Sequence, residues 1–213
     1  MKYAIIVGFG LAGFHLARQL QKQGKEFVII SDGAKGASRN AGGVLNPTIL
    51  KRYTLAWNGV AFFDHALPTY RNFEEEFDTT IFQDIPILHY FSQLSDHNNW
   101  SVAAHSKGLN QFLLPPILQS NRECIQGDLG YAKLHNVGKL EIQKMLDLYS
   151  QYLTAENLLQ ESFEYSQLKL HPDKVVYQGI EAKNIVFCEG FGLMKNPWFS
   201  YLPLTGSKGE FLH

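Results

Sequence analysis

Three glycines near the start of the chain have the spacing of a phosphate-binding turn. An apolar run, Ala4 to Val7, leads directly into Gly8-Phe9-Gly10-Leu11-Ala12-Gly13, and a helical pattern follows. In such a turn Gly8 permits the sharp change of direction, and Gly10 has no side chain to keep a pyrophosphate away from the backbone. Gly13 lets the helix pack closely on the strand. These residues predict a nucleotide pyrophosphate at the N-terminus of a helix.

An acidic residue follows at the distance expected for a ribose contact. Ala17 and Leu20 have the spacing of the inward face of the helix, Phe27 to Ile30 form a second apolar run, and Asp32 lies 24 residues after Gly8. A carboxylate there accepts hydrogen bonds from ribose hydroxyls and repels a 2′-phosphate. The alternative is that the glycines serve only a tight strand-to-helix junction and that Asp32 is an ordinary turn residue.

The composition is that of a folded protein without a strongly charged surface. The 213 residues are 45% hydrophobic, and the formal net charge is −1 with Lys and Arg scattered along the chain. This length allows one large domain or two small ones. The lack of a basic cluster disfavours direct nucleic-acid binding, and no apolar run approaches the ~20 residues of a membrane-spanning helix.

The cysteines and histidines show no metal or disulfide pattern. Cys124 and Cys188 are far apart, and the eight histidines have neither HxxH nor HExxH spacing, so we expect no metal site and two reduced cysteines. The first residues lack the features of an export signal. We therefore expect a cytoplasmic protein.

The middle of the chain predicts two helices separated by short strands. Residues 55–77 have helical apolar spacing with a kink or break at Pro68. Residues 79–135 contain short strand-like pieces separated by turn residues. Helical spacing returns over residues 136–153, where Asn136 is a candidate cap.

The last part of the chain returns to strands. Ile185 to Cys188 form an apolar run closed by Gly190, which suits a central parallel strand ending at a nucleotide. The elements together predict an α/β protein with a split, doubly wound, Rossmann-like domain and an inserted antiparallel sheet. Flavoproteins commonly divide their FAD domain around a substrate domain in this way, whereas plain NAD-binding domains do not.

Four segments together resemble the FAD-dependent amine and D-amino-acid oxidases, the group of glycine oxidase and sarcosine oxidase. They are the glycine turn with Asp32, "GASRNAGGVLNP", "NIVFCEG" and "NPWFSYLPLTGSKGE". The resemblance covers the whole chain. It implies an FAD-binding domain formed by residues 1–78 and 136–204, and a partial substrate domain formed by residues 79–135 and 205–213.

The resemblance also implies which residues contact FAD. The pyrophosphate would lie over the turn from Gly8 to Gly13, the adenosine ribose on Asp32, and the adenine at the backbone of Phe163. Ser38, Asn40, Gly42 and Gly43 would lie near the pyrophosphate, the ribityl chain or the flavin ring, and Gly190 would lie below the cofactor. Loop capping is the alternative role for Ser38 and Asn40.

The implied reaction is hydride transfer from the amine-bearing carbon of a small amine or amino acid to the flavin. The cofactor carries this chemistry, and the protein orients the substrate. We therefore name no catalytic residue. Three alternatives stay open: an FAD-binding or dinucleotide-binding module without turnover, an NAD-dependent dehydrogenase, and a flavin-dependent tRNA-modifying relative.

The chain ends soon after the Lys-Gly-Glu segment, whereas members of the family continue beyond it. We therefore expect Ser207 to His213 to begin a strand of an unfinished substrate sheet. An unfinished sheet has an edge that invites pairing. This predicts either a homo-oligomer formed through residues 79–135 or an exposed apolar patch there.

Overall fold

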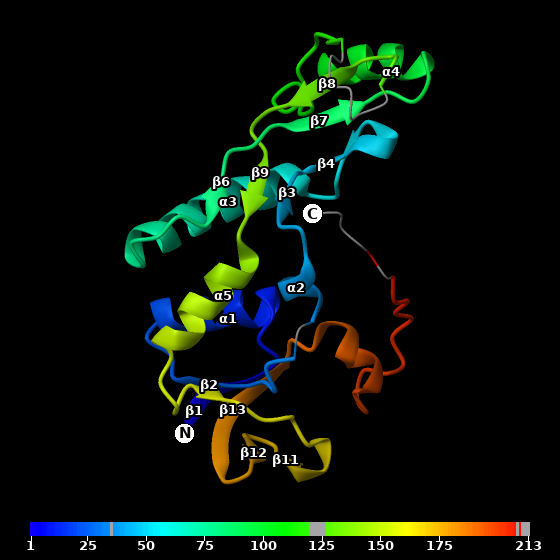
Figure 1. Ribbon diagram of the computed structural model, residues 1–213. Helices are drawn as coiled ribbons and strands as arrows, with labels where there is room; N and C mark the ends of the chain where they lie inside the picture. Colours follow the sequence, from blue (N-terminus) through cyan, green and yellow to red (C-terminus); the bar gives the residue numbers. More distant parts are fainter. Residues whose placement is uncertain (35, 120–126, 208, 210–213) are drawn as a thin grey trace. The chain divides into compact units, whose positions relative to one another are not determined.

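The computed structural model describes residues 1–34, 36–119, 127–207 and 209, which form two compact units. The first unit comprises Met1–Ala41 together with the chain from Ile142 onward, and the second comprises Gly42–Glu141 (Figure 1). The chain is an α/β protein, as expected. In the described residues no helix is long and apolar enough to cross a membrane.

The first unit is built on a six-stranded sheet in the order β10-β2-β1-β13-β12-β11. Strands β10, β2, β1 and β13 are parallel to one another. Strand β13 also pairs with β12, and β13, β12 and β11 form an antiparallel meander. The strands are β1 (Lys2–Val7), β2 (Phe27–Ile30), β10 (Leu158–Leu159), β11 (Leu168–Leu170), β12 (Val175–Tyr177) and β13 (Ile180–Phe187). The helices are α1 (Leu11–Lys22), α2 (Ala37–Asn40), α5 (Ile142–Tyr152) and the 3-10 helices η2 (Tyr165–Gln167) and η3 (Gly190–Lys195).

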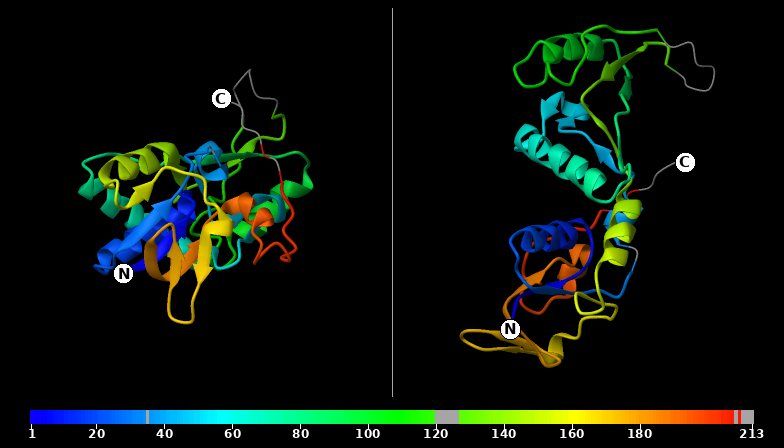
Figure 2. Two further views of the ribbon diagram at one scale, coloured as in Figure 1. Left: turned by 90° about the horizontal axis from the view of Figure 1, so that it is seen from below. Right: turned by 90° about the vertical axis from the view of Figure 1, so that its left-hand side faces the viewer.

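The two faces of this sheet have different covers. Helices α1 and α5 lie on one side of the parallel strands. The β11–β12 hairpin, which continues the sheet from β13, lies on the other side of them (Figures 1 and 2). Successive side chains of β1 alternate between these covers: Ile6 lies near α1, while Ile5 packs in a cluster with Val28 and Tyr177. Ala17 and Leu20 of α1 are buried, as their spacing predicted.

The described residues of the second unit form three small antiparallel sheets, two α-helices and a 3-10 helix. The sheets have the strand orders β3-β9-β6, β4-β5 and β7-β8. The elements are β3 (Val44–Leu45), β4 (Thr48–Ile49), η1 (Leu50–Arg52), β5 (Thr54–Leu55), α3 (Gly59–Glu76), β6 (Phe82–Gln83), β7 (Ile87–Tyr90), α4 (Ser95–Ala104), β8 (Tyr131–Leu134) and β9 (Gly138–Leu140). Its core gathers Phe63, Trp100, Phe112 and Leu134.

The boundary between the compact units differs from the predicted domain boundary. Residues 42–78 and 136–141 belong with the insertion, not with the first unit. The reason is packing: Phe63 of α3 lies edge-to-face on Phe112, with ring centroids 5.6 Å apart, and β3 pairs with β9. The roles of the units in FAD and substrate binding stay predictions.

Two predicted helices have different starts, and one helix was missed. The helix predicted over residues 136–153 begins at Ile142, because Asn136 has a φ of 52° and donates to the Gln111 carbonyl instead of capping a helix. The helix predicted over residues 55–77 begins at Gly59 and continues through Pro68. Helix α4, in the segment predicted as strands, was missed.

Three expectations fall on residues outside the described part of the chain. These are the state of Cys124, the Lys-Gly-Glu segment at Lys208 and Glu210, and the strand expected to run to His213. The homo-oligomer predicted from that strand therefore stays a prediction.

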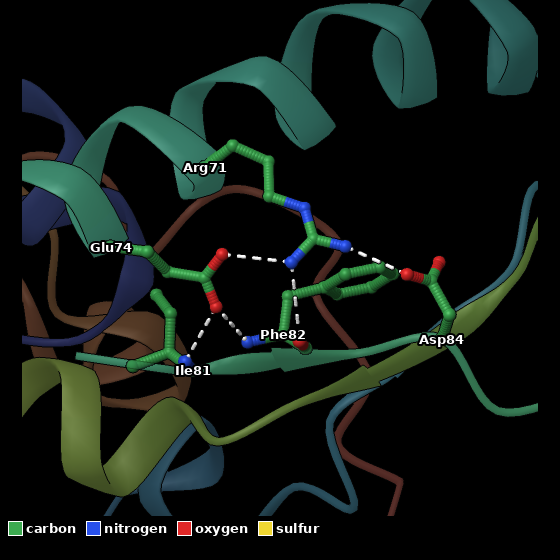
Figure 3. Close-up of polar contacts among 5 residues, drawn as sticks. All are labelled: Arg71, Glu74, Ile81, Phe82 and Asp84. Carbon is green, nitrogen blue, oxygen red and sulfur yellow. Dashed lines mark hydrogen bonds and ion pairs between the residues drawn. The ribbon is translucent and has the colours of Figure 1, made fainter.

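A half-buried carboxylate, that of Glu74, fastens α3 to β6 in the second unit (Figure 3). Glu74 Oε1 accepts hydrogen bonds from the amides of Ile81 and Phe82, at 2.7 and 2.8 Å. Its Oε2 accepts from Arg71 at 2.9 Å, and the same guanidinium reaches Asp84 at 2.7 Å. Burial alone would raise the pKa of the Glu74 carboxyl, but the hydrogen bonds from Phe82, Arg71 and Ile81 outweigh it and lower that pKa.

We expect Glu74→Gln to destabilise the protein by about 1–2 kcal/mol at neutral pH, because hydrogen bonds to a charged acceptor are stronger than those to an amide. Since the pKa of Glu74 is lowered in the folded state, its contribution is present above the pKa of the unfolded carboxyl, about 4.3, and is lost as the pH falls through the folded-state pKa. Urea unfolding at neutral and acidic pH measures this. The exposed neighbour Glu75 supplies the matched control, Glu75→Gln; an equal loss in both variants would contradict the prediction.

Candidate functional site

The parallel register places the ends of four strands in one row. Val7 pairs with both Ile30 and Phe187, and Ile30 pairs with Leu159. The backbone ladder continues one residue further, since the amide of Gly8 donates to Ile30 at 2.9 Å and the amide of Cys188 donates to Val7 at 2.7 Å. The chain turns away from the sheet after each of these ends. A crevice at the carboxyl ends of parallel strands is the usual ligand site of such sheets.

Gly8 and Gly13 make the turn compact. A Cβ at Gly8, where φ is 102°, would lie 2.5 Å from the Cys188 carbonyl oxygen, and a Cβ at Gly13 would lie 2.1 Å from the Gly8 carbonyl oxygen. Neither position has space for a side chain. The close packing of helix on strand predicted for Gly13 is confirmed, and Gly8 permits the adjoining loops to touch.

Gly10 lies where the chain enters α1, next to Ser38. The amide of Leu11 is one of the N-terminal donors of α1 that have no acceptor within the helix. It donates to Ser38 Oγ at 3.1 Å. A Cβ at Gly10 would lie 2.9 Å from the same oxygen. Ser38 therefore places a hydroxyl at a helix N-terminus whose residues Leu11 and Ala12 line the crevice. Amide donors of this kind suit an anion such as a phosphate.

The crevice forms a cleft of about 620 Å³, a size typical of small-molecule and cofactor sites. It brings together most of the residues predicted to contact a dinucleotide. Those that line it are Gly8, Gly10, Leu11, Ala12, Asp32, Ser38, Phe163 and Gly190. Their contacts with a cofactor stay predictions.

Three other predicted residues, Asn40, Gly42 and Gly43, do not line this cleft. Asn40 donates from Nδ2 to the Gly36 carbonyl at 3.1 Å, which is the alternative role of loop capping. Gly42 and Gly43 belong to the second unit. Gly43 has a φ of 72°, and a Cβ there would lie 2.0 Å from the Leu140 carbonyl oxygen, so the approach of β9 requires glycine.

Asp32 and Phe163 line the cleft at the ends of β2 and β10. Asp32 Oδ1 accepts from the amide of Ala34 at 2.9 Å, which holds the loop after β2. Its Oδ2 lies 3.5 Å from the Ser162 hydroxyl. The Phe163 ring stacks on Tyr177, with centroids 4.4 Å apart. The adenine contact predicted for Phe163 runs through its backbone and does not need this ring.

Glu189, which the sequence analysis did not single out, organises the loop after β13. Tyr165 donates its hydroxyl hydrogen to one Glu189 oxygen, and Asn196 Nδ2 donates to the other at 2.8 Å. Asn196 is fully buried, and its Oδ1 accepts from the amide of Trp198 at 2.9 Å. These bonds tie η3 and the following turn to the end of β13. A carboxylate between a predicted central strand and Gly190 was the signal that could have found it.

Burial and the Glu189 carboxylate raise the pKa of two neighbouring groups, the Tyr165 phenol and the Cys188 thiol. Burial, then the hydrogen bond and charge of Glu189, raise the pKa of Tyr165, so that the phenol stays a donor. Burial and the Glu189 charge also raise the pKa of the Cys188 thiol, which is free and half-buried. The reduced state expected for Cys188 agrees with the structure.

Arg39 and Glu161 line the cleft and were also missed. Arg39 forms an ion pair with Asp147 that ties α2 to α5. Glu161 follows β10, and its Oε1 is buried. The signal for Glu161 was an acidic residue just after an apolar pair, Leu158 and Leu159. Among the described residues, no group of three or more His, Cys, Asp or Glu side chains is placed to hold a metal ion.

The structure is similar to those of several flavoenzymes. Glycine oxidase from Bacillus cereus has a TM-score of 0.65 and 12% identity, and the match covers 88% of this chain and 55% of that chain. L-Amino acid deaminase from Proteus myxofaciens has a TM-score of 0.63 and 12% identity, with 87% and 45% covered. L-Proline dehydrogenase from P. horikoshii has a TM-score of 0.61 and 15% identity, with 88% and 52% covered.

At these identities the similarity establishes the fold alone, and the chain spans about half the length of these structures. The family itself is shown by a match of the sequence to a family model. A family model described as FAD dependent oxidoreductase matches residues 4–193, which include the glycine turn, Asp32 and the whole six-stranded sheet except the first two residues of β1. The chain therefore belongs to the FAD-dependent oxidoreductase family.

Proposed function

We propose that the cleft of the first unit binds FAD. The observation that carries the proposal is the N-terminus of α1 at the row of strand ends, where Gly10 lines the cleft without a side chain and the Ser38 hydroxyl accepts from the Leu11 amide. Amide donors and a hydroxyl fit a pyrophosphate. The Asp32 carboxylate can accept hydrogen bonds from ribose hydroxyls, and its negative charge disfavours a phosphate on the ribose.

The proposed reaction is oxidation of a small amine or amino acid. Bound FAD supplies an acceptor for a hydride from the amine-bearing carbon of such a substrate. The named neighbours include a glycine oxidase, an L-amino acid deaminase and an L-proline dehydrogenase, which supports an amino-acid substrate class. The chain's own contribution is to bind the dinucleotide and to hold the loop after β13 through Glu189, Tyr165 and Asn196.

Flavin binding and turnover are tested separately. Protein incubated with FAD and freed of excess cofactor is expected to keep the visible absorbance of bound flavin. Anaerobic addition of glycine, L-proline or a D-amino acid is then expected to bleach that absorbance. Flavin that stays bound but is reduced by none of them would favour the alternative of a binding module without turnover. NAD binding without FAD binding would contradict both.

Replacing Gly10 by Val tests the position of the pyrophosphate. The new Cβ would meet Ser38 Oγ at 2.9 Å, and the branched side chain would fill space beside the Leu11 amide. We expect the affinity for FAD to fall by about an order of magnitude or more, measured by titrating apoprotein with FAD and following flavin fluorescence. Circular dichroism establishes that the variant is folded. Undiminished affinity in a folded variant would place the phosphates elsewhere.

Replacing Asp32 by Asn tests the ribose contact with little change in shape. Asn retains an oxygen that accepts from Ala34, so the loop keeps its hydrogen bond, while the charge-assisted contact to the ribose is lost. We expect FAD affinity to fall by about three- to tenfold, less than for Gly10→Val. Asp173 lies in the exposed turn between β11 and β12, and Asp173→Asn is the matched control. A loss as large as that of Gly10→Val would mean that Asp32 has another role.

A further inference from the structure

Glu161 and Asp32 occupy equivalent positions on neighbouring parallel strands. Leu159 at the end of β10 pairs with Ile30 at the end of β2, and each carboxylate lies two residues beyond its member of that pair. The ladder extends into the loops, because the Ser31 amide donates to the Leu159 carbonyl at 3.0 Å. Both Glu161 and Asp32 line the same cleft. The register therefore places two acidic side chains at one end of the cleft.

The two carboxylates differ in how their oxygens are satisfied. Asp32 Oδ1 accepts from the amide of Ala34 at 2.9 Å, within its own loop. Glu161 Oε1 is buried, and no donor among the described residues reaches it. A buried acceptor without a donor is costly and calls for a specific explanation. Glu161 also lines the cleft proposed to bind the cofactor, where a bound ligand can supply a donor.

We infer that Glu161 is a second carboxylate of the adenosine subsite and accepts a hydrogen bond from the adenosine half of the bound cofactor. The inference rests on the proposed FAD site. Adenosine carries the required donors, the ribose hydroxyls and the exocyclic amine. A phosphate carries no donor of this kind when ionised, and two neighbouring acidic groups repel it. Glu161 is thus a specificity-determining residue that favours a nucleoside end without an added phosphate.

This role predicts opposite effects on cofactor affinity and on apoprotein stability. In Glu161→Ala the acceptor is gone, so FAD affinity is expected to fall about tenfold or more. In Glu161→Gln the amide oxygen still accepts but carries no charge, so a smaller loss is expected. Without FAD, neither variant loses a hydrogen bond of Oε1 to the described residues. The melting temperature of the Glu161→Gln apoprotein is therefore expected to stay the same or rise.

The experiment measures dissociation constants for FAD and ADP with wild-type protein and with each variant. ADP is measured by competition with FAD, and it retains the adenosine but has no flavin. The loss in Glu161→Ala is expected to have the same factor for both ligands. Glu164 lies in the same loop, is exposed, and does not line the cleft, so Glu164→Gln controls for the loss of a negative charge and is expected to bind FAD as the wild type does.

Three results would overturn the inference while leaving FAD binding intact: FAD affinity unchanged in Glu161→Ala, an equal loss in Glu164→Gln, or a loss for FAD that is absent for ADP. A lower apoprotein melting temperature in Glu161→Gln would also overturn it, because it would show a structural role. Wild-type protein that binds no FAD would instead overturn the proposed function itself. The two failures are therefore distinguishable.

Discussion

The hydrogen-bonded register of four parallel strands is the constraint on which the site depends. Because Leu159, Ile30, Val7 and Phe187 are paired in one row, the chain leaves the sheet along a single edge. These exits supply backbone amides after β1 and the carboxylates of Asp32, Glu161 and Glu189 after β2, β10 and β13. A shift of one residue in a strand would turn its side chains to the opposite face and would separate these groups.

The glycine turn serves packing and binding with different residues. Gly8 and Gly13 lie where neighbouring backbone leaves no space for a Cβ, so glycine is required there whether or not a ligand binds. Gly10 faces a serine side chain and lines the cleft, so glycine there is not required by a neighbouring backbone. The Leu11 amide bonded to Ser38 Oγ shows how the helix N-terminus is satisfied in the protein by itself. A phosphate oxygen offers the same acceptor chemistry.

The second unit has its own source of stability. Its core depends on aromatic side chains from α3, α4 and the segment before β8, and Trp100 is fully buried with its indole N–H bonded to the Leu114 carbonyl at 2.8 Å. The Glu74 carboxylate, with its two backbone donors and Arg71, fastens α3 to β6. These contacts explain why residues 42–78 pack with the insertion although they follow the glycine turn and Asp32 in sequence.

The sequence by itself determined the local elements of the first unit: the glycine turn, the apolar strands, the amphipathic helix α1 and the acid at Asp32. These depend on residue types a few positions apart, so periodicity and spacing predict them.

The sequence could not reveal α4, whose polar segment Ser95–Ala104 is helical because Trp100 reaches a distant core. Nor could it show that Asn136 bonds to Gln111 instead of capping a helix. The pairing of Leu159 with Ile30, which brings Glu161 near Asp32, and the bond from Tyr165 to Glu189 join residues far apart in the chain. Only the tertiary structure decided them, because strand order and register set which distant loops meet.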